Sequence, residues 1–89
     1  MSALISKLEG IAHLHARRVT ALELAEKYPE KGREYLAEWA GLSDAEDGRW
    51  RQYSTLPAIQ RAYERGLDDG ECILYAHGCL DARRAVMAG

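Results

Sequence analysis

The chain of 89 residues contains no phenylalanine, only two cysteines and no long hydrophobic run. Two cysteines do not form the disulfide framework that is typical of small secreted domains. No apolar segment approaches the roughly 18–20 residues that a helix needs to span a bilayer. The first residues also lack the continuous apolar region and the small-residue cleavage site of a signal peptide. These absences favour a cytoplasmic protein without a membrane helix.

The chain also has little net charge, −2 in total. There is therefore no global basic field that would attract nucleic acid or an anionic membrane. The charges are instead arranged in blocks, with a positive balance in 1–28, 49–67 and 83–89 and a negative balance in 29–48 and 68–82. Such alternation indicates neighbouring helices that place opposite charges against each other, and it also guides self-association.

What is present is typical of one globular, helical domain over residues 1–89. Hydrophobic residues make up 47% and charged residues 29% of the chain, which is ordinary for a folded protein and too apolar for intrinsic disorder. No segment shows the alternating pattern of a strand. We expect an all-α, compact bundle of about five helices with long first and last helices, over residues 3–28, 30–40, 44–53, 57–65 and 69–87.

The first of these helices has an apolar stripe about 120° wide, which we expect to face the core, with His15 at its centre. An unbroken helix of this length extends about 39 Å, whereas a sphere matching 89 residues is about 31 Å across. Either Gly10 interrupts the helix, or one end projects and packs on another chain. We favour a partner chain, and hence a homodimer. The stripe comprises Leu4, Ile5, Leu8, Ile11, Ala12, Val19 and Leu22.

Two glycines are expected to end helices. Gly41 and Gly66 are each followed by a leucine and then by a residue suited to cap the next helix. The pairs that we interpret as capping boxes are Ser43 with Glu46 and Asp68 with Glu71. Between these two joints, a helix starting near Pro57 is expected to turn Ile59, Ala62 and Tyr63 inward.

The stretch around Gly41 resembles the helix-turn-helix of DNA-binding repressors. The resemblance is carried by Leu36-Ala37, by Ala40-Gly41-Leu42 and by Trp50, and it implies a nucleic-acid-binding regulator that uses residues 36–53 and the arginines nearby. The sequence departs from the motif at Asp47, where the second helix needs an apolar core residue. Acidic residues lead that helix and would face phosphates with the wrong sign. Two helices that meet at a glycine-capped corner are therefore the favoured interpretation.

A metal or catalytic site is not supported by the spacing of the cysteines and histidines. On one helix, Cys72 and Cys79 stand about 10.5 Å apart along the axis, which is too far for two sulfurs on one zinc ion. His77 points away from Cys79, and His13 points away from His15. Both cysteines fall on an apolar face and are expected to be small buried hydrophobic residues. We expect no catalytic residue, no cofactor and no metal.

The aromatic residues gather in the middle of the chain, where arginines accompany them. Tryptophan, tyrosine and arginine are the residues enriched at binding hot spots. We therefore expect a small non-enzymatic helical protein that acts by stoichiometric binding to another protein. Short acidic helical chains of this composition include many phage-encoded inhibitors of host machinery, among them anti-CRISPR-type proteins. The expected partner-binding residues are Arg49, Trp50, Arg51, Tyr53, Arg61 and Arg65.

Overall fold

The computed structural model describes residues 3–78 and, within them, the side chains from Ile5 onward. In this range the chain forms three α-helices and one short 3₁₀-helix, and no strand. The all-α expectation is confirmed, whereas the count of about five helices is wrong. The elements are α1 (Ala3–Lys27), η1 (Pro29–Lys31), α2 (Gly32–Asp47) and α3 (Pro57–Ala76).

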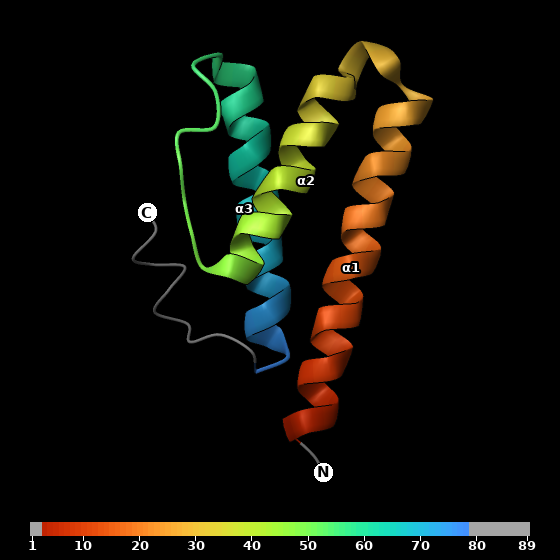
Figure 1. Cartoon of the computed structure of the whole chain (residues 1–89), viewed down its shortest axis with the longest axis vertical. Coiled ribbons are helices and arrows are strands. Elements are labelled where there is room, and N and C mark those ends of the chain that lie inside the picture. Colours follow the sequence, from red (N-terminus) through yellow and green to blue (C-terminus); the bar gives the residue numbers. More distant parts are fainter. Residues whose placement is uncertain (1–2, 79–89) are drawn as a thin grey trace.

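The three helices form a flat arrangement (Figure 1). Helix α2 runs back alongside α1, and the irregular segment 48–56 then returns the chain, so that α3 runs in the same general direction as α2 and crosses it. The Cα atoms extend over 44 × 28 × 14 Å. Helix α1 is continuous through Gly10, so the first of the two alternatives, an interruption at that glycine, does not occur.

The two glycines expected to end helices lie instead inside helices, at the point where α2 and α3 cross. A Cβ atom on Gly41 would lie 2.1 Å from the backbone oxygen of Tyr63, and one on Gly66 would lie 2.1 Å from that of Glu38. Only residues without a side chain allow two helix backbones to approach so closely. The glycines are therefore required for helix packing, and the corners predicted at residues 41 and 66 are wrong.

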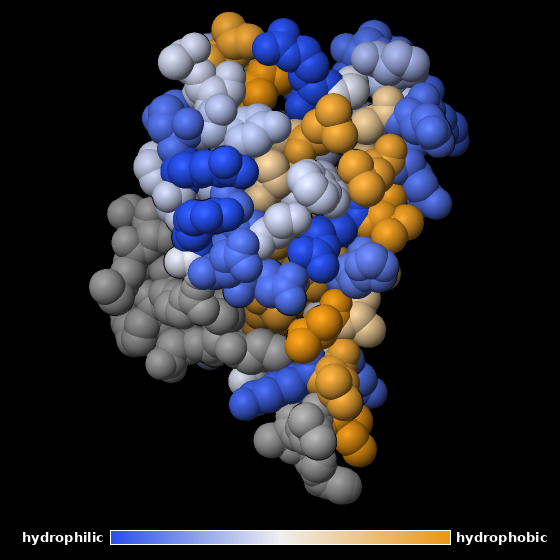
Figure 2. Space-filling view, viewed as in Figure 1, coloured by the Kyte–Doolittle hydropathy of each residue, from blue (hydrophilic) through white to orange (hydrophobic). Residues whose placement is uncertain are grey.

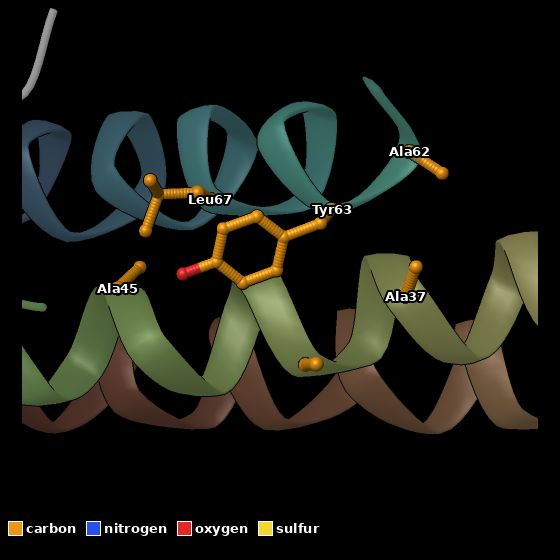
Figure 3. Packing of buried hydrophobic residues seen from close by; sticks show 6 residues of the cluster. Ala37, Ala45, Ala62, Tyr63 and Leu67 are labelled. Carbon is orange, nitrogen blue, oxygen red and sulfur yellow. The ribbon is translucent and has the colours of Figure 1, made fainter. Parts of the chain in front are cut away.

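The rest of the α2–α3 contact is also built from small residues. The buried cluster consists mostly of alanines around the ring of Tyr63, which lies across the interface with its hydroxyl toward Ala45 (Figure 3). Ala62 and Tyr63 are fully buried, as expected, and Ile59 packs against the cluster. The cluster comprises Ala37, Ala40, Ala45, Ala62, Tyr63 and Leu67.

Helix α2 ends at Gly48, which adopts a left-handed conformation with φ of 69°. The N–H of Gly48 donates to the carbonyl of Ala45, and the N–H of Arg49 donates to that of Asp44. This is the hydrogen-bond pattern of a Schellman motif, found seven residues after the glycine to which the sequence pattern assigned it. The expected helix over 44–53 is therefore wrong, because its first residues belong to α2 and the rest are irregular.

Helix α3 continues through Gly66, so neither of the two predicted capping boxes starts a helix. The final part of the predicted last helix, 79–87, lies outside the described residues. Pro57 does occupy the first turn of α3, as expected.

The apolar stripe of α1 does not face the core. Leu14 and Ala21, on the opposite side of the helix, are fully buried in a second cluster with Leu42 and Leu74. A periodic pattern identifies the most apolar side of a helix, but it does not specify which side the neighbouring helices cover. The expectation that the stripe forms the core is wrong, and His15 on that stripe is exposed.

Candidate functional site

The irregular segment 48–56 is anchored by the carboxylate of Asp44, which is only 2% exposed. One oxygen of Asp44 accepts a hydrogen bond from Arg51 Nε at 2.9 Å and another from Tyr63 Oη at 2.7 Å. Its other oxygen accepts from Arg49 Nη2 at 3.3 Å. A buried carboxylate needs such charged and hydrogen-bonding partners to offset its lost hydration. The segment that follows α2 is thereby tied to the α2–α3 interface.

The hydroxyl of Tyr63 links the same carboxylate to the backbone of the segment. It accepts a hydrogen bond from the N–H of Arg51 at 3.1 Å while it donates to Asp44. Burial, together with the charge and hydrogen bond of Asp44, raises the pKa of Tyr63 to about 12. The hydroxyl therefore remains a donor at neutral pH. The hydrogen bond to Asp44 likewise raises the pKa of the Arg51 guanidinium.

The later part of the segment is held by Gln60, a buried residue of α3. Its side-chain oxygen accepts from the N–H of Ser54 at 3.0 Å, and its nitrogen donates to the carbonyl of Arg51 at 3.4 Å. Ser54 Oγ in turn accepts from the N–H of Leu56 at 3.0 Å. Hydrogen bonds therefore fix the segment along its length although it has no regular secondary structure.

Three large side chains of the anchored segment remain accessible. Trp50 is 47% exposed, Leu56 is 45% exposed and Tyr53 is 36% exposed. The Tyr53 ring stacks on Tyr63, with 5.3 Å between their centroids. Tyr53 also borders an open cleft of about 260 Å³, which is lined by Arg33, Leu36, Tyr53, Ser54 and Ile59. We call the surface formed by Trp50, Leu56 and these cleft residues the loop surface.

The structure brings together four of the six residues expected to bind a partner. Arg49, Trp50, Arg51 and Tyr53 all lie in the anchored segment. The other two, both on α3, are Arg61 and Arg65. Arg61 is exposed.

Arg65 lies in a second ion-pair cluster, at the buried carboxylate of Glu38. Arg65 Nη2 donates to one oxygen of Glu38 at 3.2 Å, and Arg17 Nη2 donates to the other at 2.9 Å. Arg17 also reaches Asp69 on α3, at 3.2 Å. This cluster connects all three helices, so Arg65 has a structural role in addition to any contact with a partner.

Sequence reasoning did not identify the anchors Asp44 and Gln60. The sequence pattern places Asp44 at the start of a helix, where an exposed acidic residue is common. The signal that points to its true role is the pair of arginines five and seven residues later, and this signal is informative only once α2 is known to end at Gly48.

The described residues hold no group of three or more histidine, cysteine or acidic side chains that could bind a metal ion. The rings of His13 and His77 meet edge to face at 5.8 Å. Cys72 is exposed, so the expectation that it is a buried hydrophobic residue is wrong; Cys79 lies outside the described residues. Desolvation and the nearby charges of Asp68, Asp69 and Glu71 raise the pKa of the Cys72 thiol, which disfavours the nucleophilic thiolate.

A second accessible apolar surface runs along α1 on the side away from the buried Leu14 and Ala21. Figure 2 shows hydrophobic side chains along the length of this helix. Their exposed fractions lie between 39% and 56%. Isolated exposed aliphatic side chains are normal, whereas several of them on one side of a helix form a larger accessible apolar surface. We call this row the outer face of α1; its large residues are Ile5, Leu8, Ile11, Val19 and Leu22.

Among the described residues, no helix is both long enough and apolar enough to cross a membrane. Comparison of the chain with protein-family models, with curated proteins and with solved structures found no match.

Proposed function

We propose that this chain is a non-enzymatic protein that acts by binding another protein through the loop surface. The observation that carries the proposal is the anchored segment 48–56, where hydrogen bonds to buried groups hold large side chains half exposed to solvent. Side chains in a core would be covered and could not contact a partner. Side chains in a mobile loop would lose conformational entropy on binding, which lowers the affinity.

Side chains held in this way are suited to protein recognition for two reasons. The rings of Trp50 and Tyr53 provide a large contact area with few rotatable bonds, and such residues dominate binding hot spots. The side chains of Arg49 and Arg51 stay 59% and 51% exposed although each donates to Asp44. Since a guanidinium carries five N–H donors, each retains donors for a partner's carboxylates or carbonyl oxygens.

The adjacent cleft is smaller than the roughly 300–1,000 Å³ of typical small-molecule pockets. It suits a single side chain of a protein partner better than a whole metabolite. The biological role that we propose is stoichiometric inhibition of host machinery by a protein from a phage or mobile element. Such an inhibitor needs only a binding surface, and a small protein without catalytic groups can provide one.

The test is a pull-down from the native host with the wild-type chain and a double variant, Trp50→Ala with Leu56→Ala. Both residues are exposed, and neither contributes a side chain to the clusters at Asp44 and Glu38. Arg65 is left unchanged because its loss would leave the buried Glu38 with one arginine fewer. We expect the double variant to lose the partner captured by the wild type, with a dissociation constant at least about tenfold higher for the purified pair.

The matched control is Tyr75→Ala, which removes a 54% exposed aromatic ring from the far end of α3. This variant should bind as the wild type does. Unchanged binding by the double variant, with its helical circular dichroism intact, would refute the assignment of the partner site to the loop surface.

A further inference from the structure

The outer face of α1 follows a heptad repeat. Its central line alternates steps of three and four residues, and each residue on that line is exposed. This is the spacing of the a and d positions of a two-stranded coiled coil, in which the apolar period is 3.5 residues. The line consists of Ile5, Leu8, Ala12, His15, Val19 and Leu22, which we call the seam.

The seam lies opposite the side of α1 that packs within the chain. Leu14 and Ala21 are fully buried against residues of α2 and α3. Helix α1 is therefore already ordered by its own fold while the seam stays open. A helix ordered in this way does not lose backbone entropy on docking, which removes the main obstacle to coiled coils as short as this one.

The charges beside the seam select a second copy in parallel orientation. One flank carries the acidic residues Glu9 and Glu23, and the other carries Arg18. In a parallel pair the two unlike flanks face each other, and Arg18 of each copy meets Glu23 of the other. In an antiparallel pair each flank faces its own counterpart, so that acidic residues would face acidic residues. Arg18 donates through Nη1 to Glu46 of its own chain at 2.9 Å, and a guanidinium has further N–H donors that can reach Glu23 of the other copy.

We propose that two copies of this chain associate through the seam as a parallel, two-stranded coiled coil. The contact from Ile5 to Leu22 is about 26 Å long at 1.5 Å per residue. His15 pairs with its symmetry mate near the middle, and a polar residue at one core position fixes the register of such a pair. The dimer contact uses none of the loop surface, so the two proposals are tested separately.

The first experiment measures the mass of the full-length chain by sedimentation velocity at tens of micromolar. The wild type should have twice the 10.0 kDa mass of one chain. The variant Leu8→Glu with Val19→Glu, which places four carboxylates in the seam of a pair, should be monomeric with unchanged helicity.

The control is Thr20→Glu, which introduces one such carboxylate at the residue next to Val19 but outside the seam. Thr20 is exposed, and its hydroxyl donates to the carbonyl of Ala16 in its own helix. This variant should remain dimeric. A monomeric wild type at 100 μM would overturn the proposal. The seam would then be covered by another segment of the chain or by a different protein. Equal dissociation of the seam variant and the control would also overturn it.

Orientation is tested by a cysteine at a seam position, Ala12→Cys, in a chain that also carries Cys72→Ser and Cys79→Ser. In the parallel pair the two new thiols face each other, and mild oxidation should link nearly all chains as dimers. Thr20→Cys in the same background should stay unlinked. A dimer by sedimentation that Ala12→Cys fails to cross-link would contradict the parallel arrangement.

Discussion

The α2–α3 interface and the outer face of α1 use apolar residues in opposite ways. The interface is buried although it consists largely of glycine and alanine, with Tyr63 as its one large ring. The outer face carries isoleucine, leucine and valine, and it remains exposed. A ranking of segments by hydropathy would place the core in α1. In this chain the closeness of the helix backbones, and not the size of the side chains, decides which surfaces are covered.

The α2–α3 interface also contains buried charged residues. Two positions next to the helix crossing hold the carboxylates of Glu38 and Asp44. Each carboxylate is neutralised by two arginines that reach in from the edge. No side-chain nitrogen or oxygen buried among the described residues lacks a hydrogen-bond partner. The interface therefore combines dense packing with satisfied polar groups, whereas no helix within residues 3–78 covers the outer face of α1.

The largest effect is expected from a single methyl group at the helix crossing. Gly66→Ala places a Cβ atom 2.1 Å from the backbone oxygen of Glu38, and the neighbouring atoms are backbone that cannot turn aside. We expect a loss of at least about 4 kcal/mol in the free energy of unfolding, measured by urea denaturation. That is most of the stability of an ordinary small domain.

The control for this substitution is Gly32→Ala at the start of α2. There the nearest atom, the oxygen of Ala25, would be 3.5 Å from the new Cβ, an ordinary contact. Alanine should stabilise this helical position by up to about 1 kcal/mol. Similar urea midpoints for the two variants would show that α2 and α3 are not in backbone contact.

A second comparison uses two leucines on opposite sides of α1. Leu14 is fully buried and Leu8 is 56% exposed. In a Val19→Glu background, which suppresses association through the seam, Leu14→Ala should cost about 2–4 kcal/mol of unfolding free energy. Leu8→Ala should cost less than about 1 kcal/mol, because its methyl groups are already largely in water. Thermal and urea unfolding would measure both, and equal losses would mean that the outer face is covered within one chain.

A loss smaller than those of Gly66→Ala and Leu14→Ala is expected at the hydroxyl of Tyr63. Tyr63→Phe should lower the free energy of unfolding by about 1–3 kcal/mol at neutral pH, because Asp44 loses a donor and the N–H of Arg51 loses an acceptor.

The alkaline pH dependence sharpens this prediction. The pKa of Tyr63 is about 12 in the folded chain and about 10 in an unfolded one. Stability from this hydroxyl is therefore present below pH 10 and is lost as the pH rises from about 10 to 12. The wild type should lose about 2–3 kcal/mol over this range through Tyr63, whereas Tyr63→Phe should lack this part of the loss. The control Tyr75→Phe changes an exposed ring and should lose as much stability at alkaline pH as the wild type does. If Tyr63→Phe also loses as much stability between about pH 10 and 12 as the wild type, the buried network is not the source of that loss.

Part of the candidate site was predictable from local patterns. Arg49, Trp50, Arg51 and Tyr53 were grouped by composition, and they do lie in one anchored segment. The helix predicted for them is wrong, because the pattern at Gly41 indicates a helix end that Gly48 provides instead. A glycine followed by a leucine fits a helix stop, but it fits equally well a site where another helix backbone passes, and only the position of α3 distinguishes the two.

The sequence by itself determined that the chain is helical, that a long helix ends before Pro29 and that another begins at Pro57. These features follow from local preferences, since proline constrains its own backbone and that of the preceding residue. Tertiary structure alone decided that Gly41 and Gly66 meet, that Asp44 is buried and that the apolar stripe of α1 faces outward. Each of these depends on which surfaces come into contact across the chain, and the periodicity of a single helix carries no information about its neighbours.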